Sequence, residues 1–274
     1  MEEITAWQRV EIARSPKRKT ALTYIDAIFD DFIELHGDRL YRDDKAMVCG
    51  IATLAGKSVT IIAEQKGRTT KENMERNFGM PNPESYRKAI RLMKQAEKFH
   101  RPVITLIDTK GAYPGIGAEE RGQGEAIARS MFEMARLKVP ILALVIGEGS
   151  SGGALAIGVA NQVWMMENAV YSILSPEGYS SILWKDPSRF EEAAEKMKLT
   201  AKDLKDLHII DKIIKEPLEM DDDIFQEIAT NLKKEIQKEL TKLGKMSAEE
   251  LVEDRQKKFR RICEIEEENN VVKK

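Results

Sequence analysis

The sequence predicts an α/β fold with helical extensions at both ends. In the middle of the chain, short apolar runs of strand length alternate with longer amphipathic segments, and glycine-containing turns separate them. The flanking regions are charged and show helical periodicity. We therefore expect an N-terminal helical extension over residues 1–36, one core domain over 37–217 and a C-terminal helical extension over 218–274.

The N-terminal extension is expected to contain two helices, separated at Ser15-Pro16. In the second helix, apolar residues recur at helical spacing over 22–33, and Gly37 is expected to end it. The core then begins with a β-hairpin, because the apolar runs 47–54 and 58–64 flank a short glycine-containing turn.

Strands and helices alternate after the hairpin. The polar stretch 65–81 is expected to be a long loop with one short helix. Asn82-Pro83 begins a helix that runs to about Phe99, because asparagine caps helices and proline suits the first turn. Further strands are expected at 103–108, 141–146, 163–166 and 170–174. Further helices are expected at about 119–137 and 151–159, and three more helices are expected to begin at Ser175, Thr200 and Ser247.

Composition and charge exclude several classes of protein. The 44 Lys and Arg residues nearly balance the 46 Asp and Glu residues, so nothing points to nucleic acid or a membrane surface. No apolar run approaches the ~20 residues of a membrane-spanning helix, and Met1-Glu2-Glu3 does not begin a signal peptide. Cys49 and Cys263 cannot form a disulfide framework, and the three histidines lack metal-ligand spacing. We expect a cytoplasmic protein with no metal site in this chain.

Chemistry is expected at two glycine-rich turns, 108–115 and 147–154. Each joins the carboxyl end of a predicted strand to the start of a helix, where unpaired N–H groups and the helix dipole favour negative charge. Glycine lets a substrate oxygen approach these N–H groups closely. The chain contains no phosphate loop, no H-E-x-x-H and no G-x-S-x-G. Because no histidine lies nearby in sequence, Ser150 and Ser151 are expected to cap the helix and not to act as nucleophiles.

Three interpretations of the second turn stay open on spacing alone. Its small residues suit tight packing of a helix on a sheet. Gly147, Gly149 and Gly152 also spell G-x-G-x-x-G, the dinucleotide pattern, and Glu167 follows about 20 residues later. The strand expected at 170–174 comes too soon after Glu167 for a crossover helix, which favours other folds over a Rossmann sheet.

The third interpretation is an oxyanion hole. The N–H groups of Gly152, Gly153 and Ala154 are its candidate donors, with Gly149 and Ser151 beside them as substrate contacts.

The first turn and a basic loop are the remaining candidates for substrate contact. Gly111, Ala112 and Tyr113 either shape the same pocket or only hold a tight turn. In the loop before the first long helix, Lys66 and Arg68 form a basic cluster with Lys71; the cluster is either a solvated face or an attraction for phosphates. Asp108 is expected to cap the first turn, and Glu119 to start the following helix.

Long motifs resemble a known family, the alpha subunits of bacterial multisubunit acetyl-CoA carboxylase carboxyltransferases. These motifs are ELHGDRLYRDDKAMVCGIA (34–52), QKGRTTKENMERNFGMPNPESYRKAIRLM (65–93), IDTKGAYPGIGAEERGQGEAIAR (107–129), VIGEGSSGGALAIG (145–158) and YSILSPEGYSSILWKD (171–186). The resemblance covers roughly residues 20–215. Lys110 departs from the family, which usually has proline in the D-T-P-G-A-Y-P-G turn.

The resemblance implies a crotonase-like (ClpP/crotonase) fold of repeated ββα units and a role in fatty acid biosynthesis. With a zinc-bearing beta subunit in an α2β2 heterotetramer, such a protein moves the carboxyl group of carboxybiotin to acetyl-CoA and forms malonyl-CoA. Biotin is attached to the biotin carboxyl carrier protein and is carboxylated by biotin carboxylase with ATP. The resemblance assigns the oxyanion hole for the biotin ureido oxygen to Gly152, Gly153 and Ala154.

Three other functions are kept as alternatives. They are a biotin-dependent decarboxylase component with the same fold, a nicotinamide-dependent oxidoreductase, and an assembly scaffold built on the terminal helices. The sequence does not give the acyl-chain preference, because that pocket is expected on the beta subunit.

Overall fold

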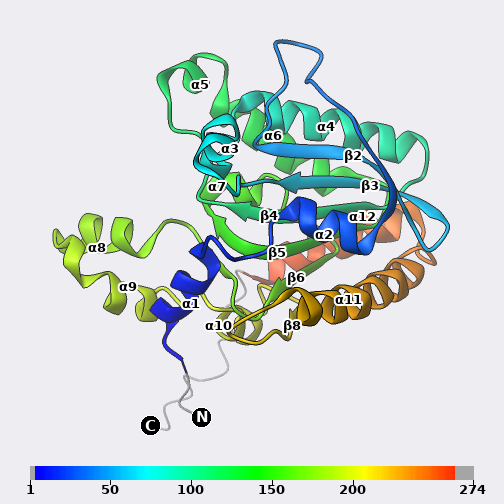
Figure 1. Ribbon diagram of the computed structural model, residues 1–274. Coiled ribbons are helices and arrows are strands. Elements are labelled where there is room, and N and C mark those ends of the chain that lie inside the picture. The colour runs from blue at the N-terminus through cyan, green and yellow to red at the C-terminus, as the bar shows by residue number, and fades with distance from the viewer. Residues whose placement is uncertain (1–3, 263–274) are drawn as a thin grey trace, which may run out of the picture.

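The computed structural model describes residues 4–262 and shows a mixed sheet between two helical layers (Figure 1). Eight strands form the sheet in these residues, in the order β1-β2-β3-β4-β5-β6-β8, with β7 paired to β5. Their bounds are β1 Asp30–Glu34, β2 Met47–Leu54, β3 Lys57–Glu64, β4 Val103–Thr109, β5 Ile141–Ser150, β6 Gln162–Met166, β7 Val170–Ser172 and β8 Lys212–Ile214. The pairs β1–β2 and β2–β3 are antiparallel, and all pairs from β3 onward are parallel.

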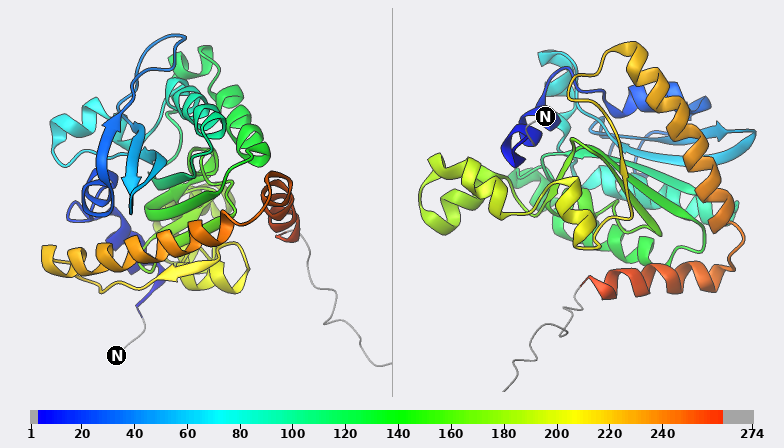
Figure 2. Two further views of the ribbon diagram at one scale, coloured as in Figure 1. Left: turned by 90° about the vertical axis from the view of Figure 1, so that its right-hand side faces the viewer. Right: turned by 90° about the horizontal axis from the view of Figure 1, so that it is seen from below.

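The helices cover both faces of this sheet (Figure 2). α4 and α6 pack side by side with α12 next to α6, and α2 and α11 contact each other on the opposite side. Their bounds, with those of the shorter helices, are α1 Ala6–Arg14, α2 Ala21–Ile28, α3 Thr70–Glu75, α4 Pro83–Lys98, α5 Ile116–Glu120, α6 Gln123–Arg136, α7 Ser151–Leu155, α8 Pro176–Trp184, α9 Phe190–Lys196, α10 Ala201–Asp206, α11 Asp222–Leu243 and α12 Ala248–Arg261. Short 3-10 turns lie at Asn77–Gly79 and Pro187–Arg189.

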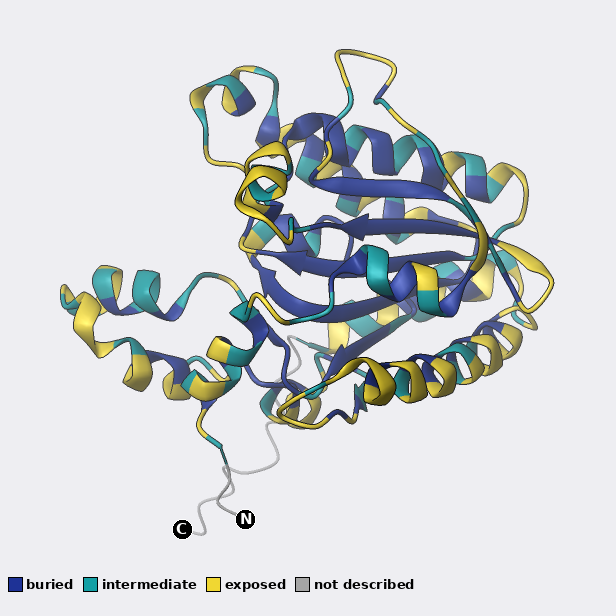
Figure 3. Ribbon diagram, viewed as in Figure 1, coloured by how far each residue is buried: buried dark blue, intermediate teal, exposed yellow. Residues whose placement is uncertain are grey.

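The core lies along the middle strands (Figure 3). Every residue of β4 and β5 is buried, as expected for parallel strands with helices on both faces. α8 and α9 extend away from this core, and their exposed surface is visible at the left of Figure 3. The core therefore places the carboxyl ends of β4 and β5, where the glycine turns begin, next to each other.

Several predicted elements are confirmed. The hairpin of β2 and β3 pairs Leu54 with Lys57, and the loop after it contains the short helix α3. Asn82 is the N-cap residue of α4, although its side chain makes no capping hydrogen bond. Ser247 and Glu250 form the capping box that begins α12.

The prediction of a helix over 22–33 is wrong at its end. α2 stops at Ile28, and Asp30–Glu34 forms the edge strand β1. The reason is tertiary: Gly50 of the neighbouring strand leaves room for the Phe32 ring, since a Cβ there would lie 2.6 Å from Phe32 Cε2. The segment before residue 36 is therefore not entirely helical. The domain boundaries themselves stay predictions.

Three other element bounds also differ from the prediction. The helix expected at 119–137 is two helices, because Gly122 adopts a left-handed backbone with φ 81° between α5 and α6. β5 continues to Ser150, so the first residues of the predicted second turn belong to a strand. α7 ends at Leu155 and not near 159.

Expectations about Met1-Glu2-Glu3, Cys263 and the chain after it lie outside the described residues. Within residues 4–262, none of the helices combines the length and the apolar character that a bilayer crossing requires.

Candidate functional site

The two glycine turns meet backbone to backbone. β4 and β5 are neighbouring parallel strands, so their carboxyl ends lie at the same edge of the sheet. Gly153 faces the first turn: a Cβ on this residue would lie 2.6 Å from the nitrogen of Ala112 and 2.7 Å from the carbonyl carbon of Gly111. Only a residue without a side chain permits this approach. The structure thus brings Gly111, Ala112 and Gly153 together.

The first turn is held from both sides. Thr109 Oγ1 accepts a hydrogen bond from the Gly111 N–H at 3.0 Å and donates to the Gly79 carbonyl at 2.6 Å. Tyr113 donates its N–H to Pro81 O at 3.0 Å, and its carbonyl accepts from Gln123 Nε2 at 2.9 Å. These hydrogen bonds hold the first turn in position next to α7.

The second turn passes from strand to helix without a loop. Ser151 adopts a positive φ of 57°, which reverses the chain directly after β5. Because the first N–H groups of a helix have no intrahelical acceptor, those of Ser151, Gly152 and Gly153 remain available, whereas Ala154 occupies the position where intrahelical bonding begins. The capping expected of Ser150 is not seen, because its side chain makes no cap hydrogen bond.

An apolar cavity of about 750 Å³ lies beside α7. Ser151, Gly152 and Leu155 line it on one side, and Tyr171, Tyr179 and Phe259 are among the residues around it. A Cβ on Gly152 would make only an ordinary contact, 3.4 Å from Ile127 Cγ2. The cavity thus adjoins the first available N–H groups of α7 and suits an apolar ring with one polar edge.

An ion-paired cluster underlies both turns. Lys66 Nζ lies 2.6 Å from Asp108 Oδ1 and 3.0 Å from Glu148 Oε2, and the side chains of both acids are almost fully buried. The Arg14 guanidinium binds the other Glu148 oxygen at 2.8 Å. Burial acts to raise the pKa of Glu148, but Lys66 and Arg14 outweigh it and lower the pKa overall. Glu148 is therefore a carboxylate at neutral pH.

A third acid in this cluster behaves differently. Glu64 is fully buried at the end of β3, and its Oε2 accepts the Asp108 N–H at 3.1 Å. Its Oε1 has no hydrogen-bond partner. Burial and the nearby Asp108 charge raise the pKa of Glu64 well above its usual range. Glu64 therefore favours its protonated form more than an ordinary glutamate does, and it lies beside the ion-paired Asp108 and Glu148.

The predicted substrate contacts fall into different environments. Lys66 is engaged by two carboxylates, so its ammonium group does not form the free basic surface that we expected. Arg68 is exposed and donates to Thr23 Oγ1. Tyr113 lies near the surface at the first turn, and Gly149 packs on the Tyr171 ring, where a Cβ would lie 2.9 Å from Cδ2.

The G-x-G-x-x-G pattern does not form a dinucleotide loop. Gly147 and Gly149 are strand residues, so the chain has no glycine loop between β5 and α7. Gly147 instead makes room for the Asp108 carboxylate, since a Cβ there would lie 2.3 Å from Oδ1. Glu167, the acid that the dinucleotide interpretation invoked, is paired with Lys215 at 2.7 Å.

Sequence reasoning missed Glu64, Glu148 and Arg14 as members of the site. A signal existed for the two acids, because each follows a buried apolar run at the carboxyl end of a strand. No local signal marks Arg14, which reaches Glu148 from α1. Asp108 was expected to cap a turn but is a buried ion-pair partner.

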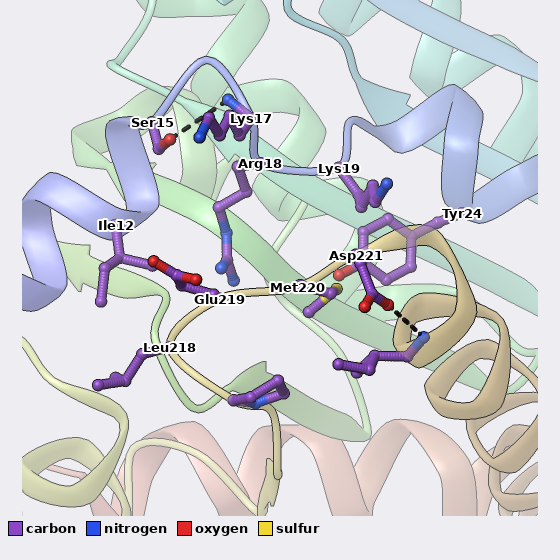
Figure 4. A pocket seen from close by; sticks show the side chains of 12 residues that line it. Ile12, Ser15, Lys17, Arg18, Lys19, Tyr24, Leu218, Glu219, Met220 and Asp221 are labelled. Carbon is purple, nitrogen blue, oxygen red and sulfur yellow. Dashed lines mark hydrogen bonds between the residues drawn. The ribbon is translucent and has the colours of Figure 1, made fainter.

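A second cavity, of about 670 Å³, lies between the segment after α1 and residues 217–221 (Figure 4). Two of the cations that line it are engaged: Arg18 pairs with Glu216 at 2.8 Å, and Lys19 pairs with Asp222. It does not adjoin either glycine turn. Among residues 4–262, no three or more His, Cys, Asp or Glu side chains are grouped so that they could hold a metal ion.

Comparison with known proteins identifies the family. The model of the family described as acetyl co-enzyme A carboxylase carboxyltransferase-like matches residues 1–263. The chain belongs to this family. It is 57% identical to the acetyl-coenzyme A carboxylase carboxyl transferase subunit alpha of Clostridium acetobutylicum over 270 residues, 98% of either chain. It is 59% identical to the subunit of the same name from Staphylococcus haemolyticus over 256 residues, 93% of this chain and 81% of the relative.

Solved structures confirm the predicted crotonase-like α/β fold. Transcarboxylase 12S superposes with a TM-score of 0.69 at 18% identity, over 88% of this chain and 45% of that one. The beta subunit of Pseudomonas aeruginosa geranyl-CoA carboxylase gives 0.66 at 16% identity, over 90% and 46%. A Pseudomonas malonate decarboxylase chain gives 0.65 at 16% identity, over 80% and 90%. Sequence identities this low establish the fold alone.

Proposed function

We propose that the turn beginning α7 binds the ureido oxygen of carboxybiotin during carboxyl transfer to acetyl-CoA. As a member of this family, the chain is a carboxyltransferase subunit of acetyl-CoA carboxylase, the enzyme that forms malonyl-CoA. The observation that supports the site is the contact of Gly153 with the Gly111–Ala112 peptide, which orients the start of α7 beside an apolar cavity.

The residues present suit biotin. The biotin ring system is apolar apart from its ureido group, and the cavity beside Gly152 is lined mainly by apolar side chains. Carboxybiotin supplies the carboxyl group as CO2 and a ureido nitrogen that accepts a proton from the acetyl methyl group. We assign no general base to the described residues, because Asp108 and Glu148, the acids within the two turns, are buried and engaged by Lys66.

The N–H groups of Gly152 and Gly153 stabilise the negative charge that develops on the ureido oxygen. Donors fixed by the backbone need no reorganisation during the reaction, and removing one such donor typically costs about 2.7–4 kcal/mol of transition-state stabilisation. We assign Ala154, predicted as a third donor, to packing, because its N–H is at the first position that can bond within the helix.

A partner subunit completes the site in this proposal. The zinc-bearing beta subunit binds most of acetyl-CoA, the assembly is an α2β2 heterotetramer, and the biotin carboxyl carrier protein delivers biotin from biotin carboxylase. The exposed apolar residues Ile173, Ile182 and Leu183, in and just before α8, support a protein contact on this side of the molecule. Arg68 precedes α3 and Lys71 lies in its first turn; both are exposed, and their charge attracts phosphates or the carrier.

Reconstitution tests this function. The chain is co-expressed with its beta subunit and combined with biotin carboxylase, carrier protein, ATP, bicarbonate and acetyl-CoA. Malonyl-CoA that forms only when both subunits and the biotinylated carrier are present supports the proposal. Release of CO2 from malonyl-CoA without any biotin requirement would instead indicate a decarboxylase, and NAD(H) binding seen by calorimetry would indicate an oxidoreductase.

A further inference from the structure

We propose that Lys66 is a positioning residue for carboxyl transfer: it holds Asp108 and Glu148 together and thereby sets the spacing of the two glycine turns. The inference rests on the proposed site at these turns. It assigns to Lys66 a role different from both alternatives that the sequence left open, a solvated face and an attraction for phosphates.

The cluster joins the ends of three strands. Lys66 follows β3, Asp108 is in β4 and Glu148 is in β5. Asp108 Oδ1 binds Lys66 Nζ at 2.6 Å and also accepts the backbone N–H of Glu148 at 3.0 Å. A single carboxylate oxygen therefore bridges β4 and β5 at the first residues of the two turns, where the register of the two strands is irregular between Ile107 and Thr109.

The packing around Lys66 holds its ammonium group in place. Its aliphatic stem lies against Gly79, where a Cβ would approach Lys66 Cγ to 2.6 Å. The carbonyl of Gly79 accepts a hydrogen bond from Thr109 Oγ1, which also bonds to Gly111. The stem and the ammonium group of Lys66 thus contact elements that end at the first turn.

Electrostatics explains why a cation is required at this position. Without Lys66, the carboxylates of Asp108 and Glu148 would face each other in a buried site where neither keeps its ammonium partner; Arg14 binds Glu148 alone, and Arg18 acts on Asp108 only through its charge. Buried like charges repel strongly, so the strand ends would separate or one acid would take up a proton. Either change moves the Glu148 N–H and the residues after it, and α7 begins three residues later.

Small displacements are sufficient to affect the reaction. Oxyanion donors act at 2.7–3.1 Å from the charged oxygen, and misplacing reacting groups by about 1 Å costs roughly 100-fold in rate. Lys66 is not among the residues that line the proposed cavity, and its ammonium group points to Asp108 and Glu148 instead. Its effect must therefore appear in kcat and not in the binding of acetyl-CoA.

The test compares Lys66→Met with Lys88→Met in the purified alpha–beta complex. Lys88 serves as the control, since it is more buried than Lys66 (1% of its side chain exposed against 16%) and likewise pairs with an acid, Asp43, at 2.6 Å, but its partners are in the loop at residues 43–44. We expect Lys66→Met to lower kcat for malonyl-CoA formation about 100-fold with KM for acetyl-CoA within about threefold. Lys88→Met should lower the melting temperature yet keep kcat within about threefold. Lys66→Arg, which keeps the positive charge, should have a kcat at least about tenfold higher than that of Lys66→Met.

Two results would overturn the proposal. One is a folded Lys66→Met complex with kcat within about threefold of wild type; the other is an equal loss of kcat in Lys88→Met. If Lys66→Met does not fold, Glu148→Gln replaces it: this change keeps the shape but weakens the pairing, and an unchanged kcat would again overturn the proposal. The proposed site is tested separately with Gly153→Ala, since full activity there contradicts the site whatever Lys66 does.

Discussion

The neighbouring glycines of α7 offer a sharp test of the site, because one added methyl group has opposite consequences at the two positions. In Gly153→Ala the new Cβ would lie 2.6 Å from Ala112 N, 2.7 Å from Gly111 C and 3.0 Å from Gly111 Cα. These are backbone atoms that cannot rotate away, so the two turns must separate. In Gly152→Ala the nearest atom is Ile127 Cγ2 at 3.4 Å, a flexible side chain at ordinary contact distance.

The magnitudes follow from this geometry. Carbon and nitrogen normally touch at about 3.5 Å, so Gly153→Ala requires a shift approaching 1 Å, enough to misplace an oxyanion donor. Losing one donor costs about 10²–10³ in kcat. The overpacking costs about 1–3 kcal/mol of folding free energy, partly offset by the roughly 1 kcal/mol by which alanine favours a helix. Gly152→Ala gains the helix preference of alanine without any overpacking, so it should be at least as stable as wild type.

The assay measures malonyl-CoA formation by each variant with the beta subunit, the biotinylated carrier and acetyl-CoA. Thermal melting and co-purification with the beta subunit establish that each variant folds and assembles. We expect kcat to fall at least about 100-fold in Gly153→Ala and to stay within about threefold in Gly152→Ala. Equal kcat values for the two folded variants would refute the reasoning. The structure also shows that a side chain at Gly153 acts by pushing the first turn, and not by blocking the cavity.

Three further predictions concern the surroundings of the site. Because burial raises the pKa of Glu64, the unfolded chain loses this proton above about pH 4.5 while the folded protein retains it, so wild-type stability falls as pH rises. Glutamine at this position cannot ionise, so the melting temperature of Glu64→Gln relative to wild type should increase as pH rises above about 4.5; parallel melting curves would contradict this assignment. Arg255 donates to the buried carbonyls of Met134, Leu137 and Val139, so Arg255→Met leaves three acceptors unpaired and should lose about 3 kcal/mol or more in urea unfolding; a loss below about 1 kcal/mol would show that α12 docks without it. Replacing Arg68 and Lys71 together by Gln should weaken the salt dependence of KM with kcat unchanged; an unaltered salt dependence would show that the loop is only a solvated face.

Much of the fold could be predicted because the relevant information is local. β4 and β5 are continuous apolar runs, and their burial on both faces is what such runs predict. The β2–β3 hairpin and the capping box of α12 each depend on residues a few positions apart. The two glycine turns were found for the same reason, since strand, glycine and helix start adjoin one another in sequence.

Other features depended on contacts that no local pattern contains. Asp30–Glu34 has the apolar spacing of a helix, yet it forms a strand because the edge of β2 and the space above Gly50 are available to it. Gly147 matched a dinucleotide motif, but its role is to admit the Asp108 carboxylate from the neighbouring strand. In both cases the residue that determines the local structure lies in a neighbouring strand.

The sequence by itself determined the family, the strands of the core and the two turns where chemistry is expected. Only the tertiary structure decided which charges meet beneath those turns, since Lys66 pairs with Glu148 across 82 residues of sequence. The physical reason is that strand and turn formation are set by neighbouring residues, whereas an ion pair forms only where the assembled sheet brings its strand ends together. The meeting of Gly153 with Gly111 is likewise a property of the packed sheet.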